Sequence, residues 1–231
     1  MNLKNQIQEV AIKNGVDLFG ISNIDRFQEA PKGFHPRDIY DKTESVIVYA
    51  IKLPGETLFA DNPVPFTHIN TLAMQKMDQI SFNISYELDK LGIKTVLIPT
   101  DDPYLYWDEE KHEGRAILSL RHAALMAGLG KLGKNNLLIN QKYGNMVQIG
   151  ALLTPEKLEA DPMANYDVCP PKCNICIENC PQHALTGSTV IQKECRPVSN
   201  FRTNKGYFIK QCFMCRKKCP STLGVKFYSA N

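Results

Sequence analysis

Cysteines dominate the chemistry that this sequence could perform. All eight lie between positions 169 and 219, in two closely spaced runs with one more cysteine between the runs. In order they read Cys169-x3-Cys173-x2-Cys176-x3-Cys180, then Cys195, then Cys212-x2-Cys215-x3-Cys219. The last cysteine of each run is followed by proline. Tandem Cys-x2-Cys-x3-Cys-Pro runs are typical of chains that bind two cubane iron–sulfur clusters.

Eight thiolates suffice for two [4Fe–4S] clusters, each held by four cysteines. The spacing is similar to that of bacterial two-cluster ferredoxins, in which the cysteine before proline serves the other cluster. This resemblance implies a first set of Cys169, Cys173, Cys176 and Cys219. It implies a second set of Cys180, Cys195, Cys212 and Cys215. Because these interleaved ligands close long loops, we expect cluster binding and folding of this region to depend on each other.

Alternatives exist for the metal and for two of the ligands. Two zinc sites with four cysteines each are possible, although zinc sites more commonly use separated Cys-x2-Cys pairs. Cys195, well upstream of Cys212, could instead be a core cysteine. The gap between Cys169 and Cys173 is three residues where ferredoxins have two. A three-iron cluster in the first set is therefore a further alternative.

The residues before the cysteines have the periodicity of a mixed α/β domain. The patterns predict helices over 3–14, 68–91 and 116–127, strands over 16–21, 45–51 and 93–98, and a hairpin of 137–140 with 146–154. The segment 45–51 is almost continuously apolar, as expected of a strand covered on both faces. We therefore expect an α/β domain over 1–160, a linker near 155–167, and a small cluster domain over 161–231.

A glycine-rich turn follows the third predicted helix. Gly128-x-Gly130-x-x-Gly133 matches the dinucleotide fingerprint, and with Lys134 it also matches a P-loop without the hydroxyl residue, since Asn135 follows. Both motifs need a strand before and a helix after the glycines. The predicted order is reversed, which favours a tight helix-to-strand turn. In a third interpretation, the bare backbone lets a large flat cofactor or the cluster domain approach. The candidate cofactor-binding residues are Gly128, Gly130, Lys131, Gly133, Lys134 and Asn135.

Residues 127–140, followed by Tyr143-Gly144, resemble the core of epoxyqueuosine reductases, and more distantly reductive dehalogenases. The segments 15–21 and 44–48 and the cysteine region match the same family. The resemblance implies a nitroreductase-like α/β sandwich core that holds base-off cobalamin, followed by a bacterial-ferredoxin-like domain. Its two clusters would pass electrons to cobalt. The sequence contains no Asp-x-His-x-x-Gly run to supply a lower histidine ligand, which is compatible with base-off binding.

Two departures from the family bear on the substrate. The family continues into a helical-repeat domain that helps to hold tRNA, whereas this sequence ends at Asn231. Gly114, with Glu113 beside it, aligns where the family has its acidic proton donor. We therefore expect a small-molecule or corrinoid partner rather than tRNA, and a substrate other than epoxyqueuosine.

A reductase needs a proton donor beside its electron source. The candidates are Glu113, His122 and Tyr104, with Tyr106 as a fourth, because they lie in the loop and helix that lead to the glycine turn. Each could equally be structural or solvent-exposed. Trp107 could stack on a flat cofactor or anchor the loop to the domain.

Charge separates the two parts of the chain. The segment from position 167 to the end carries a net charge of +7, which leaves −4 for the remainder. Cations near the cysteines could offset cluster charge, or could bind nucleic acid. We expect an iron–sulfur oxidoreductase that accepts electrons from a donor such as a ferredoxin or flavodoxin. The alternative is a ferredoxin-like electron carrier without chemistry of its own. No signal or membrane segment is predicted, so we expect a cytoplasmic protein.

Overall fold

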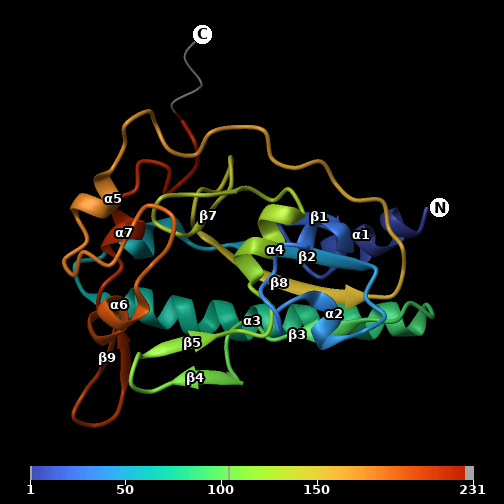
Figure 1. Cartoon of the computed structure of the whole chain (residues 1–231), viewed down its shortest axis with the longest axis horizontal. Coiled ribbons are helices and arrows are strands. Elements are labelled where there is room, and N and C mark those ends of the chain that lie inside the picture. The colour runs from blue at the N-terminus through green and yellow to red at the C-terminus, as the bar shows by residue number, and fades with distance from the viewer. Residues whose placement is uncertain (1, 104, 227–231) are drawn as a thin grey trace.

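The computed structural model describes residues 2–103 and 105–226, and its centre is a four-stranded antiparallel sheet (Figure 1). The strand order is β1 (Leu18–Asn23), β2 (Ser45–Lys52), β8 (Val147–Thr154) and β3 (Val96–Ile98). β2 pairs with β8 along its whole length, from Ser45 opposite Thr154 to Lys52 opposite Val147. The sheet strand that comes last in the chain therefore lies between two strands that precede it.

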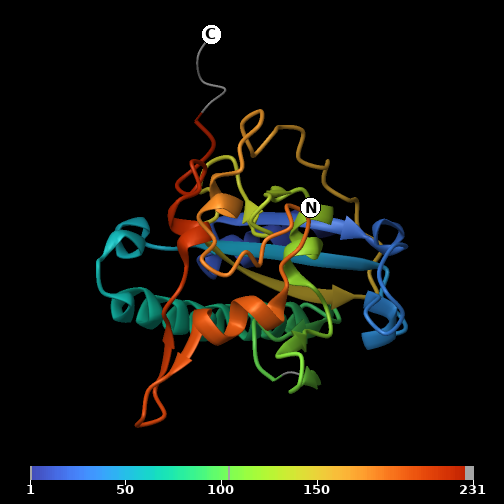
Figure 2. The same ribbon diagram turned by 60° about the vertical axis from the view of Figure 1, so that its left-hand side comes forward.

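Both faces of the sheet are covered, as the apolar run in β2 predicts. Ile47 and Tyr49 belong to one hydrophobic cluster, whereas Val46 and Val48 belong to another on the opposite face. The helices in the first cluster are α1 (Leu3–Lys13) and α3 (Pro63–Lys90), and the helix in the second is α4 (Leu120–Met126). Figure 2 shows α3 running along the sheet as the longest element. The predicted mixed α/β architecture is therefore present, with helices on both faces.

The helix α3 begins five residues earlier than the sequence pattern predicts. Pro63 and Pro65 both lie in the first turn of the helix, where a missing backbone N–H costs nothing. The side chain of Asn62 caps this end by accepting a hydrogen bond from the Val64 amide at 2.8 Å. The strand β3, which follows α3 in the chain, is shorter than predicted. It lies at the edge of the sheet and is therefore only half-buried.

The predicted hairpin of 137–140 with 146–154 is wrong. β7 (Leu138–Ile139) pairs with β6 (Lys131–Leu132), while β8 pairs with β2 and β3. An isolated bridge joins Asn140, at the end of the first predicted arm, to Gly144 in the connection between the arms. The physical reason is that β8 gains two long-range partners in the sheet, which a local hairpin would exclude.

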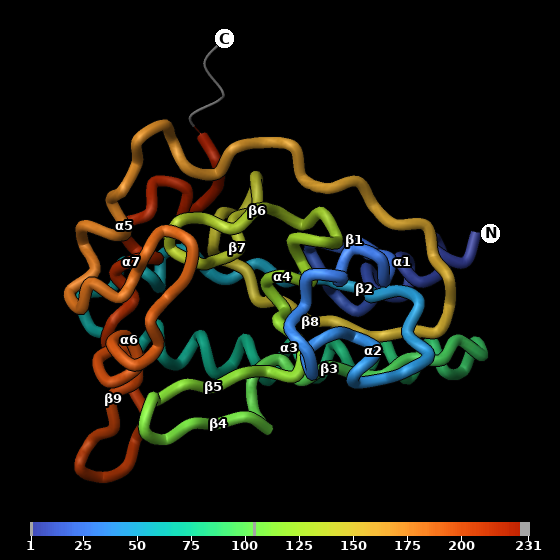
Figure 3. The backbone as a smooth tube through the Cα atoms, in the orientation of Figure 1, coloured from blue at the N-terminus to red at the C-terminus, as the bar shows by residue number. Residues whose placement is uncertain are grey.

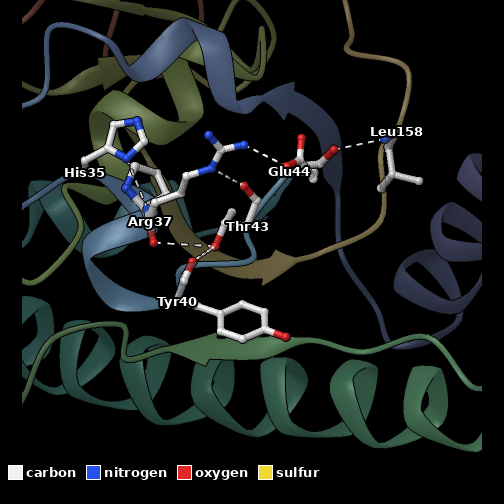
Figure 4. A network of polar contacts seen from close by, with 8 residues as sticks. His35, Arg37, Tyr40, Thr43, Glu44 and Leu158 are labelled. Carbon is white, nitrogen blue, oxygen red and sulfur yellow. Dashed lines mark hydrogen bonds and ion pairs between the residues drawn. The ribbon is translucent and has the colours of Figure 1, made fainter.

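The turn-rich connection between β1 and β2 is held by a polar network (Figure 4). It includes the short segments η1 (Ile24–Phe27) and α2 (Pro36–Ile39). His35 and Asp38 form a capping box at the start of α2. Arg37 donates to the carbonyl oxygen of Thr43 at 2.9 Å and forms an ion pair with Glu44 at 2.7 Å. These contacts fix the chain as it enters β2.

The segment 155–167, expected to be a linker, is an ordered strap along the edge strand β1. The Asp161 amide donates to the Ile21 carbonyl oxygen, and the Ile21 amide donates to the Asp161 carboxylate, both at 2.8 Å. Lys4 forms an ion pair with Asp161 at 2.7 Å. The Leu158 amide donates to the Ser45 hydroxyl at 3.0 Å, as Figure 4 also shows. The strap thereby satisfies part of an otherwise open sheet edge.

The cysteine region gathers at one end of the molecule, in orange and red in Figure 3. Its elements are α5 (Ile175–Glu178), α6 (Gln192–Ser199), β9 (Asn200–Arg202), β10 (Phe208–Lys210) and α7 (Met214–Lys217). The remaining elements of the chain are η2 (Gly55–Phe59), β4 (Tyr106–Asp108) and β5 (Glu113–Arg115). None of the helices in the described part of the chain combines the length and apolar character that a membrane span requires.

Candidate metal centre

The two cysteine runs lie against each other through their short helices. Cys176 lies on α5 and Cys215 lies on α7, and these two helices are in contact. A small hydrophobic cluster joins Cys176 and Cys180 to Ala184 and Leu185. The interior of this region is therefore built largely from the cysteines themselves.

The first set predicted from the sequence converges on one cavity. Cys169, Cys173, Cys176 and Cys219 all line one small pocket. The pKa of the Cys219 thiol is raised to about 11, mainly by burial and to a smaller extent by the charges of the other three cysteines of this set. Cys219 belongs to the second run in sequence, yet its neighbours are the first three cysteines of the first run. Cys169, whose spacing departs from the ferredoxin pattern, lines the cavity with the others.

The second predicted set is also brought together. Burial raises the pKa of the Cys215 thiol to about 11, and the nearby charges that add to this effect are those of Cys195, Cys212 and Cys180. The pKa of Cys195 is raised by burial and by Cys180 and Cys212. Cys180 therefore lies with the second run although it ends the first. Cys195 lies among the other three members of its set.

All eight cysteines are free thiols rather than disulfides. Across residues 2–103 and 105–226, no three His, Cys, Asp or Glu side chains meet closely enough to ligate one shared metal ion. A tetrahedral zinc site requires sulfur atoms about 2.3 Å from a single ion. A cubane cluster instead places its thiolates around a bulky inorganic core, so its ligands surround a space rather than a point. The four cysteines of the first set line one pocket together.

The glycine turn holds both cysteine runs. The Lys134 ammonium donates to the Cys173 carbonyl oxygen and to the Asn174 side chain, both at 2.8 Å. The Asn135 side chain donates to the Cys215 carbonyl oxygen at 3.2 Å. Two consecutive residues of the turn therefore fix one run each, which supports the interpretation that this turn receives the cysteine region.

The glycines of this turn make close backbone approaches to other parts of the chain. Gly128 and Gly130 lie between α4 and β6, and Gly133 follows β6, so the helix precedes the strand as predicted and the geometry of a nucleotide motif is absent. A Cβ atom added to Gly128 would lie 2.1 Å from the Pro162 carbonyl oxygen. A Cβ atom on Gly130 would lie 2.4 Å from the Ile139 carbonyl oxygen, and one on Gly133 would lie 2.5 Å from the same residue's side chain. Protein atoms, rather than open space, therefore cover these three glycines. The side chain of Lys131 lies 4.0 Å from the Asp167 carboxylate.

Arg216 is a site residue that sequence reasoning missed. Its guanidinium donates to the Asn145 carbonyl oxygen and lies 3.9 Å from the Met146 sulfur. Burial lowers the pKa of this guanidinium, while the charges of Cys215 and Cys219 raise it. The available signal was the spacer between those two cysteines, which contains three consecutive cations. Nothing in the sequence indicates which of the three is buried.

Comparison with known proteins gives related sequences of two kinds. A relative named epoxyqueuosine reductase, from Staphylococcus aureus, is 25% identical over 96% of this chain and 65% of its own length. A tetrachloroethene reductive dehalogenase from Dehalobacter restrictus is 27% identical over 83% of this chain and 32% of its own length. The chain is related to epoxyqueuosine reductases and reductive dehalogenases. No family model matches it. The resemblance predicted from the sequence is thereby confirmed, and the chain spans less than two thirds of these relatives.

Solved structures of both kinds share the fold. The epoxyqueuosine reductase of Streptococcus thermophilus has a TM-score of 0.67 at 19% identity, covering 96% of this chain and 66% of that protein. A catabolic reductive dehalogenase bound to 3-bromo-4-hydroxybenzoic acid has a TM-score of 0.69 at 17% identity, covering 95% of this chain and 32% of that protein. The mixed α/β fold is therefore that of these reductases. Another epoxyqueuosine reductase was solved with a modified tRNA stem loop, so the expectation of a partner other than tRNA stays a prediction.

The proton donors predicted beside the reductase core are not brought together. Glu113, on β5, forms an ion pair with Arg115 at 2.7 Å. His122, an exposed residue of α4, forms a hydrogen bond with the Ser119 hydroxyl at 2.7 Å. Burial of its ring and the charge of Arg121 lower the pKa of His122, which favours the neutral imidazole at neutral pH. Tyr104 lies outside the described residues. Glu113 and His122 are thus engaged with their own neighbours, and Tyr106, on β4, packs its ring against that of Phe34 with the ring centres 5.1 Å apart.

The loop that leads to α4 contains a small hairpin of β4 and β5, which helix α6 of the cysteine region holds in place. The Gly114 amide donates to the Gln192 side-chain oxygen, and the Gln192 side-chain amide donates back to the Gly114 carbonyl, both at 3.1 Å. The Arg196 guanidinium lies over the Trp107 ring, 5.1 Å from its centre. Cys195 lies between Gln192 and Arg196 on helix α6. Of the two roles weighed for Trp107, anchoring of the loop is the one observed.

Proposed function

We propose that this chain is an iron–sulfur oxidoreductase with two [4Fe–4S] clusters. The support is the exchange of cysteines between runs: Cys219 lies with the first run and Cys180 lies with the second. This crossing is the pattern of two-cluster ferredoxins. In this proposal residues 161–231 form a ferredoxin-like cluster domain, and residues 1–160 form a nitroreductase-like core on which the electrons are used.

The residues around the two sets suit bound clusters. A bound cluster supplies reversible one-electron transfer, and its charge must be compensated when it is buried. Lys134 places an ammonium group at the first run, and Arg216 lies in the chain between Cys215 of one set and Cys219 of the other. Helix α7 and the residues after it contribute Cys215 to one set and Cys219 to the other. This shared segment favours electron transfer between the two sites.

A corrinoid is a candidate cofactor because of the family relationship. One related reductive dehalogenase structure is described as suggesting a mechanism for B12-dependent dehalogenation. The residues predicted to bind such a group do not fit it in this structure. Pro162 and Ile139 cover the glycines, and the cysteine region engages Lys134 and Asn135. The proposed electron path is therefore assigned only from the clusters to the glycine turn.

The crossed ligand pattern gives a direct test. Anaerobically reconstituted protein is expected to contain about eight irons and eight sulfides per chain. Cys219→Ala is expected to abolish the same cluster as Cys173→Ala, and Cys180→Ala the same cluster as Cys212→Ala. Iron analysis and electron paramagnetic resonance of the reduced variants would identify which cluster is lost. Zinc in place of iron and sulfide, or pairing of the losses by sequence run, would refute the proposal.

An electron carrier without its own chemistry is the second candidate. The covered glycine turn favours it, as does the net charge of +7 in the segment beginning at position 167, which suits an acidic ferredoxin or flavodoxin. Titration of the iron-loaded protein with cobalamin separates the candidates. A change in the visible spectrum with retained cobalt favours the oxidoreductase, whereas no retained cobalt favours the carrier.

A further inference from the structure

The strands β9 and β10 form a hairpin that projects from the cysteine region, as Figure 1 and Figure 2 both show. Its base is anchored to α3, because the Lys210 amide donates to the Thr67 hydroxyl at 3.0 Å. Its turn is closed by the Gly206 amide, which donates to the Thr203 carbonyl oxygen at 2.8 Å. The hairpin is therefore an ordered element with a tip that extends into solvent.

Three aromatic rings of this hairpin are exposed. The exposed fractions are 42% for Phe201, 68% for Tyr207 and 39% for Phe208. Arg202 pairs with Phe208 across the ladder, so a cation and a ring share one face of the hairpin. Exposed apolar groups that lie together mark sites of interaction, and aromatic and Arg side chains are enriched where proteins meet. The hairpin therefore has the composition of a protein-binding surface.

The charge of this region has one sign. The segment from Cys195 to the end of the chain contains eight Lys or Arg residues and no Asp or Glu residue. Arg202 and Lys205 of the hairpin are exposed, and the ion pairs within residues 2–103 and 105–226 involve other cations. A surface of one charge attracts a partner of the opposite charge and accelerates its association. The complementary partner is therefore acidic.

A nucleic acid is also acidic, but it fits this surface less well than a protein does. Nucleic-acid strands are bound by several cations that follow successive phosphates. Other cations of the region are directed elsewhere: Lys217 lies 3.4 Å from the Phe59 and Ala60 carbonyl oxygens, and Arg196 lies over the Trp107 ring. Within residues 200–210 only two cations are exposed, and they stand beside exposed rings. This combination favours an acidic protein.

The hairpin is inserted between two members of the second cysteine set. β9 begins five residues after Cys195, and β10 ends two residues before Cys212. The Gln211 amide donates to the Ser199 carbonyl oxygen at 3.1 Å, which joins the two connecting segments. A protein docked on the hairpin would therefore lie against the segments that carry Cys195 and Cys212.

We propose that the β9–β10 hairpin is the docking surface for an acidic electron-transfer protein, which reduces the second cluster first. The inference rests on the proposed iron–sulfur function and adds the partner and its place of docking. In the docked complex the partner loses one electron and the second cluster gains it, with no bond made or broken. The electron reaches the first cluster through the segment that contains Cys215 and Cys219.

The test is stopped-flow reduction of the full chain, reconstituted anaerobically and analysed for iron, by a reduced acidic flavodoxin at low ionic strength. Arg202→Glu combined with Lys205→Glu is expected to lower the second-order rate constant about tenfold, and added salt is expected to reduce this difference. Lys94→Glu combined with Lys157→Glu makes the same change in net charge at exposed positions near Thr154, at the other end of β8. This control is expected to change the rate constant less than about twofold. Excess dithionite is expected to reduce the clusters of all variants to the same extent.

An unchanged rate constant in the hairpin variant, or an equal loss in the control variant, would overturn the inference. Wild-type clusters that accept electrons from dithionite but not from the flavodoxin would also overturn it. An unchanged rate constant, with weaker binding of an RNA stem loop or lost self-association in the hairpin variant, would assign the surface to nucleic acid or to a second copy of the chain.

Arg202→Gln combined with Lys205→Gln covers the case in which the Glu variant fails to assemble. Neutralisation removes half as much charge as reversal, so the expected loss of rate is about threefold. An unchanged rate constant in this variant would overturn the inference as well. A wild-type protein without iron and sulfide would instead refute the proposed function.

Discussion

At the residue scale, two glycines allow the cost of backbone strain to be distinguished from the cost of close packing. Gly128 and Gly92 have nearly the same backbone conformation, with φ of +77° and +78°. They differ in their surroundings, because the Pro162 carbonyl oxygen lies 2.1 Å from the Cβ position of Gly128, whereas nothing lies within 4 Å of that of Gly92. The pair therefore provides a matched comparison.

We expect Gly92→Ala to lower the free energy of unfolding by about 1 kcal/mol, the cost of a left-handed alanine. Gly128→Ala carries the same backbone cost and also forces the turn and the strap apart. We expect this second effect to lower the free energy of unfolding by about a further 2 kcal/mol. Urea denaturation of proteins with equal iron content would measure both changes. Equal losses in the two variants would contradict the close approach of the strap to Gly128.

The cysteine sets were the part of the site most accessible from sequence. Ligand type and spacing are local properties, so the two groups of four could be predicted and the structure brings them together. The contacts of Lys134 and Asn135 were not predictable in detail, because their partners lie 39 and 80 residues away. The burial of Arg216 likewise depends on the turn at Asn145, which is 71 residues distant.

At the element scale, the hairpin of β4 and β5 is coupled to the cysteine region by one glutamine. Gln192 both donates to and accepts from the backbone of Gly114, as a neighbouring strand would. Its helix α6 also contains Cys195. The position of the hairpin therefore depends on an element that includes a proposed cluster ligand.

Removal of the Gln192 side chain in Gln192→Ala is expected to increase hydrogen exchange of the Gly114 amide about fivefold, since one net hydrogen bond contributes about 1 kcal/mol. Amide-resolved exchange monitored by NMR would measure it. Lys193→Ala changes an exposed neighbour on the same helix and should leave the rate unchanged. Equal exchange in Gln192→Ala and the wild type would contradict the coupling.

Elements with strong local periodicity were predicted well, and those that depend on distant partners were not. The helix α1 and the strand β2 agree with the sequence pattern to within one or two residues. The short strands β4 and β5 are held by Gln192, 78 residues from Gly114, and have no local pattern. The predicted hairpin failed for the same reason, because the pairing of β8 is decided by β2, roughly one hundred residues earlier.

At the scale of the whole molecule, the two parts differ in what stabilises them. The sheet has two extended hydrophobic clusters, whereas the interior of the cysteine region contains Cys176 and Cys180 beside only a few apolar side chains. Small regions without a large apolar core usually depend on metal or disulfide cross-links. Stability of the cysteine region should therefore follow its metal content.

Iron removal with a chelator under reducing conditions is expected to expose residues 169–226 to trypsin while residues 3–154 stay protected. Mass spectrometry of the fragments over time, beside the iron-loaded protein, would measure this difference. We expect cleavage in the cysteine region to accelerate at least tenfold, as local unfolding replaces a folded state. Equal cleavage rates with and without iron would show that this region folds independently of metal.

The central position of β8 has a consequence for biosynthesis. β2 and β3 both pair with β8, so neither completes its hydrogen bonding until Thr154 has emerged from the ribosome. Exposed strand edges in nascent chains favour aggregation, which makes this interval the vulnerable stage of synthesis. All eight cysteines follow residue 154, and their maturation therefore begins on a chain whose sheet can already close. The order of translation thus places core folding ahead of iron delivery.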